Sequence, residues 1–287
     1  MKLINFKLGE QIHLGIKIEA GVIDVTSSVR HTLFAAPTTM EQVIASGQVG
    51  LSQLTELMKQ KVKILPEEQL VYAPCVVKPE KILCVGLNYV SHAAESKIDI
   101  PTSPVLFSKF NNALAAHQQI IKLPKVAEKF DYEAELVIVI GKEASNVSKE
   151  EALSYVFGYT TGNDLSARDL QFRSGQWLLG KTCDHFAPVG PYLVTADGLD
   201  PNSLNIICEV NGVVRQSANT RDMIFDCATI ISYASQYMTL QPGDIIFTGT
   251  PSGVILGYPE AEQKWLKSGD EIKVSIEGIG TLQNILV

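Results

Sequence analysis

The segment at residues 131–140 constrains the fold more than any other part of the chain. Its first half alternates carboxylates with Tyr and Ala, and its second half, residues 136–140, is apolar without interruption. Successive side chains of a strand point to opposite faces, so a strand that is apolar on both faces has to be covered on both sides. The chain is therefore expected to build layers around this strand.

Two carboxylates, Glu133 and Glu135, stand at the beginning of the same strand and project from one face. Neighbouring buried carboxylates repel each other, and their desolvation is costly unless a cation or hydrogen bonds compensate for it. Mg²⁺ or Mn²⁺ is one solution, because both ions prefer oxygen ligands. The alternative is that the strand begins in contact with water.

A third acidic group lies within residues 162–169. Asp164 follows an apolar and aromatic stretch and is expected to end a strand, and Ser166 is expected to cap a helix. Asp164 is then the candidate third metal ligand. Arg168 lies about one helical turn further on, where it can bind a substrate carboxylate. The alternative is that Asp164 caps locally and Arg168 is paired at the surface.

Two further segments carry residues suited to catalysis. His92 and Glu95 are three residues apart, which places them on one face of a helical turn and lets the carboxylate orient the imidazole as a general base. Lys181 follows an apolar stretch and is a candidate buried ammonium. The loop at residues 249–253 can present backbone N–H groups to an anion. The alternatives are an exposed His–Glu pair, a lysine that snorkels to the surface and an ordinary Gly/Pro turn.

The chain divides into a small first unit and a large second one. The first 26 residues alternate polar and apolar positions, as short antiparallel strands do. A capping box at Thr39 opens a helical stretch that is broken near Gly47 and Gly50, and residues 63–79 are extended and rich in proline. We expect a small N-terminal α/β domain at residues 1–70, a linker at residues 71–79 and a catalytic domain at residues 80–287.

The second unit mixes strands and helices without the regular alternation of a parallel α/β fold, so an antiparallel, β-rich α+β core is expected. A capping box at Ser148 opens one helix, and residues 222–238 have the periodicity of a longer one. Asn211-Gly212 and residues 278–280 are expected hairpin turns. Strands are expected at residues 82–85, 105–107, 134–140, 204–210, 244–247 and 271–276.

Composition excludes several classes of protein. With 46% hydrophobic and 19% charged residues the chain is neither disordered nor a coiled coil. With 24 Lys and Arg against 31 Asp and Glu, it is not expected to bind nucleic acid. No apolar run approaches the ~20 residues of a membrane helix and the N-terminus lacks a signal-peptide core, so a cytoplasmic protein without membrane contact is expected. The five cysteines are scattered, which favours reduced thiols.

Over residues 80–287 the chain resembles the fumarylacetoacetate hydrolase family, because five short motifs occur in the order typical of that family. The longer eukaryotic hydrolases of the family have a metal-binding Asp where this chain has Asn88. The chain therefore resembles the shorter acylpyruvase-like and oxaloacetate-decarboxylase-like members. The motifs are Gly86-x-Asn88-Tyr89 with His92-x-x-Glu95, Asp131-Tyr-Glu133-x-Glu135-Leu, Asn163-Asp164-x-Ser-Ala-Arg168-Asp169, Gly180-Lys181, and Gly249-Thr250-Pro251-x-Gly253.

The resemblance implies a mixed β-sandwich roll with a small N-terminal domain, assembled as a homodimer, and a Mg²⁺ or Mn²⁺ ion held by Glu133, Glu135 and Asp164. It also implies a small 2-oxo or 1,3-diketo acid as the substrate. The expected activity is hydrolysis of a carbon–carbon bond, as in acylpyruvates or fumarylacetoacetate. Oxaloacetate decarboxylation and keto–enol isomerisation at the same metal site are alternatives, and so is a non-catalytic protein that binds oxo acids.

The resemblance also assigns roles to the remaining motif residues. In the expected hydrolysis His92, oriented by Glu95, activates the water, and the metal together with Lys181 stabilises the enolate. The segment after Asn88 is rich in small residues and is implied to form a lid over the substrate. The residues implied to hold the polar end of the substrate are Arg168, Gln171 and Thr250.

Overall fold

Strand β11 (Ala134–Ile140) lies in the middle of the molecule, between two apolar cores. Each of its residues is buried. Leu136 and Ile138 pack in the core that the two main sheets enclose, whereas Val137 and Val139 pack in a second core that includes apolar residues of the N-terminal unit. The predicted burial of this strand on both faces is confirmed, and the two cores explain why no polar residue interrupts it.

The computed structural model describes residues 1–30, 34–95 and 99–287. The largest sheet follows the order β4-β3-β2-β1-β15-β12-β11-β18-β6-β7, with β5 paired to β1. Its pairs are antiparallel apart from β18 and β6, which are parallel. Besides β11, its strands are β1 (Lys2–Leu8), β2 (Gln11–Ile18), β3 (Gly21–Asp24), β4 (Ile64–Leu65), β5 (Val71–Tyr72), β6 (Ile82–Gly86), β7 (Val105–Lys109), β12 (Val156–Asn163), β15 (Tyr192–Thr195) and β18 (Ile245–Phe247).

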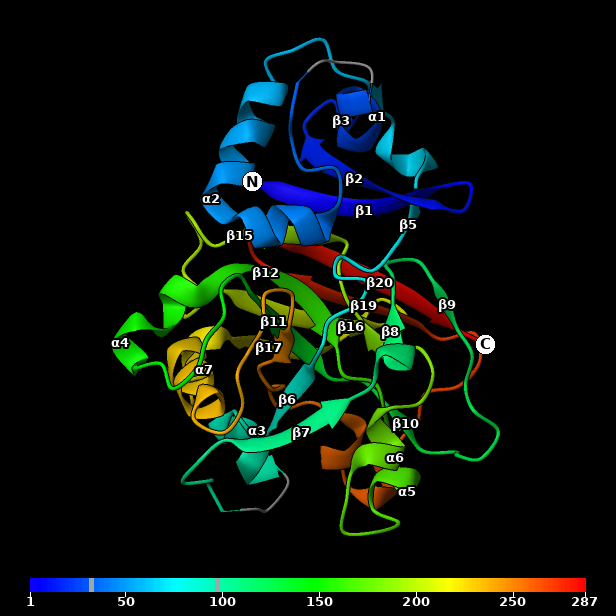
Figure 1. Cartoon of the computed structure of the whole chain (residues 1–287). Helices are drawn as coiled ribbons and strands as arrows, with labels where there is room; N and C mark the ends of the chain where they lie inside the picture. The colour runs from blue at the N-terminus through cyan, green and yellow to red at the C-terminus, as the bar shows by residue number, and fades with distance from the viewer. Residues whose placement is uncertain (31–33, 96–98) are drawn as a thin grey trace.

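A five-stranded sheet in the order β17-β16-β19-β20-β9 packs against the larger one and completes a sandwich (Figure 1). Its strands are β9 (Ile120–Ile121), β16 (Asn205–Val210), β17 (Val213–Asn219), β19 (Glu271–Ile276) and β20 (Gly280–Leu286). Two short pairs flank the sandwich: β8 (Leu114–Ala115) with β14 (Ala187–Pro188), and β10 (Phe130–Asp131) with β13 (Ser166–Ala167). The fold is therefore a β-rich α+β sandwich with mixed sheets, as predicted.

The helices lie around the sheets, and apart from α2 those in the described ranges are short. In Figure 1, α4 and α7 lie together on one side of the sandwich and α5 and α6 lie together at one end. The α-helices are α1 (Val25–Arg30), α2 (Met40–Leu57), α3 (Val90–Glu95), α4 (Lys149–Ala152), α5 (Arg168–Gln171), α6 (Leu178–Lys181) and α7 (Cys227–Ser235). The 3-10 turns are η1 (Glu67–Gln69), η2 (Asn111–Ala113), η3 (Leu153–Tyr155), η4 (Thr220–Asp222), η5 (Ile255–Gly257) and η6 (Glu260–Glu262).

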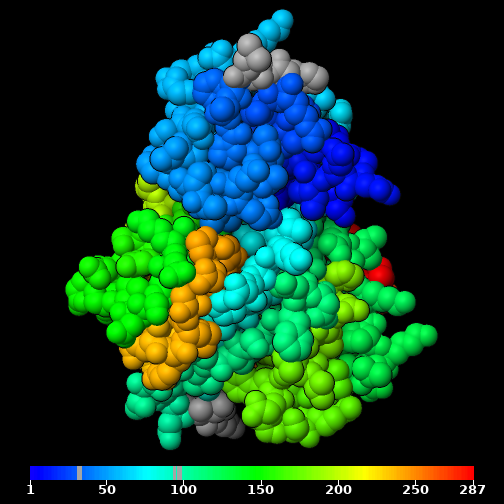
Figure 2. All heavy atoms as spheres, in the orientation of Figure 1, coloured from blue at the N-terminus to red at the C-terminus, as the bar shows by residue number. Residues whose placement is uncertain are grey.

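The N-terminal unit shares a sheet with the larger unit. Strand β1 pairs with β2 on one side and with β15 on the other, and the Met1 ammonium donates a hydrogen bond to Thr195 Oγ1 (2.5 Å). The expected linker at residues 71–79 begins as β5, which also pairs with β1. Figure 2 shows the N-terminal residues, in blue, as a lobe that rests directly on the remainder of the chain. Continuous hydrogen bonding therefore joins the two units.

Most predictions from short stretches of sequence are confirmed. Helix α2 is kinked at Gly47, where a break was predicted, but Gly50 lies inside the helix. Asn211 and Gly212 both have positive φ and connect β16 to β17 as a hairpin turn, which confirms that prediction. The cysteines are free, as expected. Within the described ranges, no helix has the length and apolar character needed to cross a membrane.

Two helix predictions were wrong in detail. The helix expected over residues 222–238 is the shorter α7, because the side chain of Asp226 accepts a hydrogen bond from Thr229 N (2.7 Å) and starts the helix there. Ser166 does not cap α5, since its hydroxyl donates to the backbone oxygen of Asp164 (3.0 Å) while its backbone belongs to β13. In both cases a local side-chain hydrogen bond explains why the helix differs from the prediction.

Asp24, at the end of β3, anchors the start of α1. Its carboxylate accepts hydrogen bonds from Ser27 N (2.9 Å) and Ser27 Oγ (2.6 Å) and pairs with His13 Nδ1 (3.0 Å). Burial alone would raise the pKa of Asp24, but the bonds from Ser27 and His13 outweigh burial and hold that pKa below its usual value. The ionised carboxylate therefore stabilises the fold above its ordinary pKa, and this contribution is lost as the pH falls through the lowered pKa.

Replacing Asp24 with Asn should lower the free energy of unfolding by about 1–3 kcal/mol near neutral pH, because buried N–H and hydroxyl donors lose an ionic acceptor. The difference from the unaltered protein should shrink as the pH falls below about 4, the ordinary pKa of this carboxyl in the unfolded chain, and towards the lowered pKa of the native carboxyl. Urea unfolding followed from pH 7 to pH 3 measures both effects. The exposed Asp197→Asn variant is the control, and a stability difference that stays constant over this range would contradict the assignment.

Candidate active site

Four strands of the large sheet meet at one edge, where β6, β12 and β18 end and β11 begins. The antiparallel register pairs Ala134 of β11 with Asn163 of β12. The residues just outside this pair are therefore neighbours, and Asp164 N donates a hydrogen bond to the backbone oxygen of Glu133 (2.9 Å). Strand pairing thus brings together the acidic groups that the sequence separates.

Glu133, Glu135 and Asp164 form a buried acidic triad. Each offers a carboxylate oxygen, and these oxygens lie within 4.8 Å of one another. The three side chains belong to residues that are 5%, 1% and 0% exposed, respectively. The alternative that β11 begins in contact with water is therefore wrong.

Two buried lysines reach this triad. Lys181 Nζ donates to Glu133 Oε2 (2.7 Å) and Asp164 Oδ2 (2.8 Å), and Lys181 is 2% exposed, so it does not snorkel to the surface. Lys109 Nζ pairs with Asp164 and donates to two backbone carbonyl oxygens. A Cβ at Gly180 would lie 2.4 Å from a backbone nitrogen of α5, so glycine is needed for α6 to deliver Lys181 here.

Arg168, the first residue of α5, is directed inward rather than to the surface. Its Nη2 lies 2.7 Å from Glu133 Oε1 and 2.8 Å from Asp131 Oδ2, and its Nη1 donates to Gln171 Oε1 (2.9 Å). Arg168 is 4% exposed, so the alternative of a surface ion pair is wrong. These protein groups occupy most of its N–H donors, and its contact with a substrate stays a prediction.

The buried charges of the site do not cancel. When all groups are ionised, the carboxylates exceed the cations by one negative charge. Glu135 accepts a hydrogen bond from Gly249 N (2.7 Å), but no cation in the described part of the chain lies within ion-pair distance of it. The carboxylates are Asp131, Glu133, Glu135 and Asp164, and the cations are Lys109, Arg168 and Lys181.

This imbalance shifts the pKa values of the two triad glutamates in opposite directions. Burial and the negative charges of Asp164 and Glu133 raise the pKa of Glu135 well above its usual range. Burial opposes ionisation of Glu133 too, but Lys181 and Arg168 outweigh it and hold the pKa of Glu133 below its usual value. Neighbouring cations thus keep Glu133 ionised, whereas Glu135 lacks such compensation.

The triad fits a divalent cation. Three carboxylate oxygens are the donor set that Mg²⁺ and Mn²⁺ prefer. A second observation is the buried Glu135 carboxylate, which has a hydrogen bond but no ion pair among the described residues. A divalent charge held by Glu133, Glu135 and Asp164 would turn the net charge of the cluster from negative to positive, which suits an anionic substrate.

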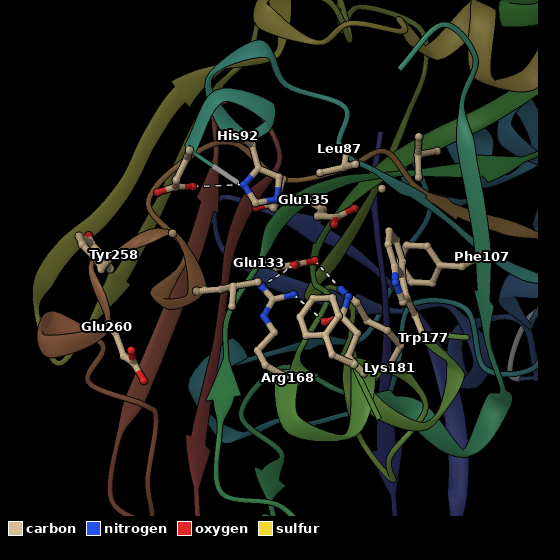
Figure 3. A pocket seen from close by; sticks show the side chains of 18 of the residues that line it. Leu87, His92, Phe107, Glu133, Glu135, Arg168, Trp177, Lys181, Tyr258 and Glu260 are labelled. Carbon is tan, nitrogen blue, oxygen red and sulfur yellow. Dashed lines mark hydrogen bonds and ion pairs between the residues drawn. The ribbon is translucent and has the colours of Figure 1, made fainter. Parts of the chain in front are cut away.

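His92 and Glu95 share a cavity with the triad. The cavity has a volume of about 560 Å³, and Figure 3 shows the imidazole on the opposite side of the two triad glutamates from Arg168. His92 Nδ1 lies 3.2 Å from Glu95 Oε2, and Glu95 Oε1 accepts a hydrogen bond from Gly253 N (2.9 Å). The predicted His–Glu pair therefore exists, and the alternative of an exposed histidine is wrong because His92 is buried.

The cavity wall is apolar and aromatic beside Lys181. The rings of Phe107 and Trp177 make an edge contact with centroids 5.4 Å apart, and Lys181 Nζ lies 5.1 Å from the Phe107 centroid (Figure 3). Gln171 and Thr250 also line the cavity, and Thr250 Oγ1 accepts a hydrogen bond from Gln216 Nε2 (2.8 Å). Every predicted site residue except Asp164 lines this cavity, and Asp164 lies behind it in contact with Lys181.

Sequence reasoning missed two charged residues of the site. Lys109 ends an apolar strand, where a lysine is usually exposed, so its burial carries no local signal. Asp131 was visible as the first carboxylate of the acidic motif, but its pairing with Arg168 depends on contact between β10 and β13. Both residues are recognisable only once the strands are paired.

Asn88 has a structural role in this chain. Its Nδ2 donates to the backbone oxygens of Phe225 (2.9 Å) and Thr248 (2.6 Å), and its Oδ1 accepts from Phe225 N (2.8 Å). The side chain is thus committed to backbone groups. Part of the expected lid after Asn88, residues 96–98, lies outside the described residues.

Comparisons with known proteins agree with this site. Residues 81–287 match the family described as "Fumarylacetoacetate (FAA) hydrolase C-terminal". A Rattus norvegicus protein named as a mitochondrial oxaloacetate tautomerase is 39% identical over 293 residues, which cover 100% of this chain and 92% of that relative. Because this relative is named mitochondrial, the expected cytoplasmic location stays a prediction.

Two solved structures are similar over their whole length. A fumarylacetoacetate hydrolase from Exiguobacterium antarcticum has a TM-score of 0.86 and 35% identity, covering 100% of this chain and 99% of its own. A maleylpyruvate hydrolase from Sphingobium sp. SYK-6, in complex with manganese(II) and pyruvate, has a TM-score of 0.82 and 32% identity with the same coverage. The fold is therefore shared with proteins that are named as hydrolases.

Replacing Lys109 with Met should destabilise the metal-free protein by about 3 kcal/mol or more, because Asp164 loses a buried cationic partner. Saturating Mn²⁺ should recover part of this loss, since a cation at the triad replaces the missing positive charge and binds only the folded state. Urea unfolding with a chelator and with Mn²⁺ measures both quantities. The exposed Lys142→Met variant is the control, and a loss below about 1 kcal/mol would show that Lys109 is dispensable.

Proposed function

The chain belongs to the fumarylacetoacetate hydrolase family, and on that premise we propose that it is a divalent-metal-dependent enzyme of small 2-oxo acids. The first proposed reaction is proton transfer between the keto and enol forms of oxaloacetate. The name of the Rattus norvegicus relative supports this choice. The second is hydrolysis of a carbon–carbon bond in an acylpyruvate, which the name of the Sphingobium relative supports.

One observation carries the proposal. A single cavity is lined by Glu133 and Glu135 of the acidic triad, by the buried Lys181 ammonium and by the His92–Glu95 pair, and Asp164 lies directly behind it. These are the groups required to bind an oxo acid, to stabilise negative charge on its oxygen and to move a proton. Both proposed reactions need all three functions at one place.

Different groups of the site are proposed to bind different parts of the substrate. When bound at the triad, Mg²⁺ or Mn²⁺ would supply the positive charge that polarises a 2-oxo group. Gln171, Thr250 and the remaining donor of Arg168 Nη1 face the cavity and are proposed to hold the polar end of the substrate. Phe107 and Trp177 form an aromatic wall beside Lys181, and we propose that this wall excludes water from that side of the bound substrate.

Keto–enol transfer needs a base that later acts as an acid. Because Glu95 holds His92 Nδ1, the other ring nitrogen is available to the substrate. It takes the proton from carbon 3, the electrons of that C–H bond form the carbon–carbon double bond, and the oxygen at carbon 2 gains a proton. The Lys181 ammonium stabilises the negative charge that develops on that oxygen.

In the hydrolytic candidate the same pair acts on water. His92, oriented by Glu95, would take a proton from the water that attacks the distal carbonyl, and the carbon–carbon bond would break to leave an enolate near Lys181. Oxaloacetate decarboxylation uses the same binding site without an attacking water. The three reactions therefore differ chiefly in what His92 does.

The remaining proposals concern assembly and partners. We propose a homodimer that binds a small 2-oxo or diketo acid and no nucleic acid, in keeping with the excess of 31 acidic over 24 basic residues. Sedimentation equilibrium at micromolar protein tests the dimer, and a monomer at this concentration would contradict it.

Metal dependence can be tested directly on oxaloacetate. We expect metal-stripped protein to accelerate loss of the enol absorbance only after Mg²⁺ or Mn²⁺ is added, measured against buffer with the same metal. Glu135→Gln should lower kcat/KM by at least about 100-fold, equal to roughly 2.7 kcal/mol, because it removes a metal ligand. The exposed Glu150→Gln variant should behave like the unaltered protein. Full activity without metal would refute the proposal, whereas tight binding of oxo acids without turnover would favour a binding protein.

His92→Ala separates the candidate reactions, because one positioned acid–base group contributes about 10²–10⁴-fold. Tautomerisation of oxaloacetate and hydrolysis of acetylpyruvate or fumarylpyruvate should each fall by at least about 100-fold. Decarboxylation of oxaloacetate should fall by less than about tenfold, since it needs no attacking water. Absorbance assays of the three substrates with the same metal give the comparison. Equal losses in all reactions would assign His92 either a structural role or a proton transfer that all of them share.

A further inference from the structure

Asp131 lies directly behind the acidic triad and is fully buried. One of its oxygens, Oδ2, accepts from Arg168 Nε (2.9 Å) and lies 2.8 Å from Arg168 Nη2. The same Nη2 lies 2.7 Å from Glu133 Oε1. Both nitrogens meet the same carboxylate oxygen, so Asp131 anchors the edge of the guanidinium group whose Nη2 meets Glu133.

Asp131 also holds the segment that forms part of the cavity wall. Its Oδ1 accepts from Ile255 N (2.8 Å), and its Oδ2 accepts from Leu256 N (3.1 Å). Leu256 lines the cavity, and two residues before this pair Gly253 N donates to Glu95 Oε1 (2.9 Å). One carboxylate thus contacts both the support of Glu133 and the segment that supports Glu95.

Glu133 is held from both sides by this arrangement. Arg168 binds Oε1 and Lys181 binds Oε2, so the direction of the carboxylate depends on where Arg168 lies. Partners that orient metal ligands contribute substantially to metal affinity, and their loss costs about 10–100-fold. Asp131 anchors Arg168 at Nε and Nη2, and Nη2 is the atom that also meets Glu133.

We propose that Asp131 is a positioning residue for metal binding, which acts through Arg168 on the direction of Glu133. This inference rests on the proposed metal-dependent function. Asp131 does not contact the cavity itself, so it has no direct role toward the substrate. A merely structural role would be confined to fixing residues 255–256.

The test is Mn²⁺ binding, measured by calorimetric titration of the metal-stripped protein. Asp131→Asn keeps the size of the side chain but turns a donor toward Arg168, and its Kd for Mn²⁺ should rise by about 10–100-fold. The control is Asp169→Asn, which makes the same charge change at the neighbouring residue. Among the described residues, Asp169 accepts hydrogen bonds only from the backbone N–H groups of Glu128 and Leu170, so the Kd of this variant for Mn²⁺ should change by less than about twofold.

A double-mutant cycle shows whether Asp131 acts through Arg168. Arg168→Gln alone should weaken Mn²⁺ binding. Adding Asp131→Asn should weaken it little further, because without Arg168 the residue at position 131 no longer contacts Glu133 through the guanidinium group. Additive losses, or an unchanged Kd in folded Asp131→Asn protein, would overturn the inference. If Asp131→Asn does not fold, Arg168→Gln decides, and an unchanged Kd there overturns it. No Mn²⁺ binding by the unaltered protein would refute the proposed function and this inference together.

Discussion

The structure depends on the placement of a charged cluster at the buried end of β11. Four carboxylates and three cations are buried together, and burial of each charge is offset by the opposite charges beside it. The apolar cores on the two faces of β11 fix the backbone that carries Glu133 and Glu135. The charged cluster can therefore exist at the end of β11 only because the two apolar cores stabilise the sandwich.

The lysines and the arginine of this cluster already bind two of the carboxylates that are proposed to hold the metal ion. Lys181 already binds Glu133 and Asp164, so a cation at the triad has to share these oxygens or replace the ammonium as their partner. Affinity is then a difference between two large electrostatic interactions and depends strongly on small displacements. Under the proposed metal-dependent function, metal affinity therefore also depends on buried groups that do not line the cavity.

Sequence reasoning succeeded where a property is local. The two-faced apolar strand, the spacing of Glu133 and Glu135, and the turn at Asn211 each follow from alternation or backbone geometry, and the resemblance between motifs identified Asp164 and Lys181. It failed where a property arises from distant pairing. Lys109 is buried only because its ammonium reaches Asp164, and β15 is short and reads as a strand only beside β1 and β12. No window of sequence contains such information.

The pairing of β1 with β15 also has a consequence for biosynthesis. Residues 2–4 bond to residues 192–194, so β1 has to wait until β15 has been synthesised before this edge is covered. Contacts of such sequence separation slow folding, and an uncovered strand edge invites wrong partners in the interval. Strand β2 occupies the other side of β1, and β5 pairs only with residues 6 and 7 on the side that β15 later covers. The strand edge at residues 2–4 therefore stays open for most of translation, although the same residues later join the two units.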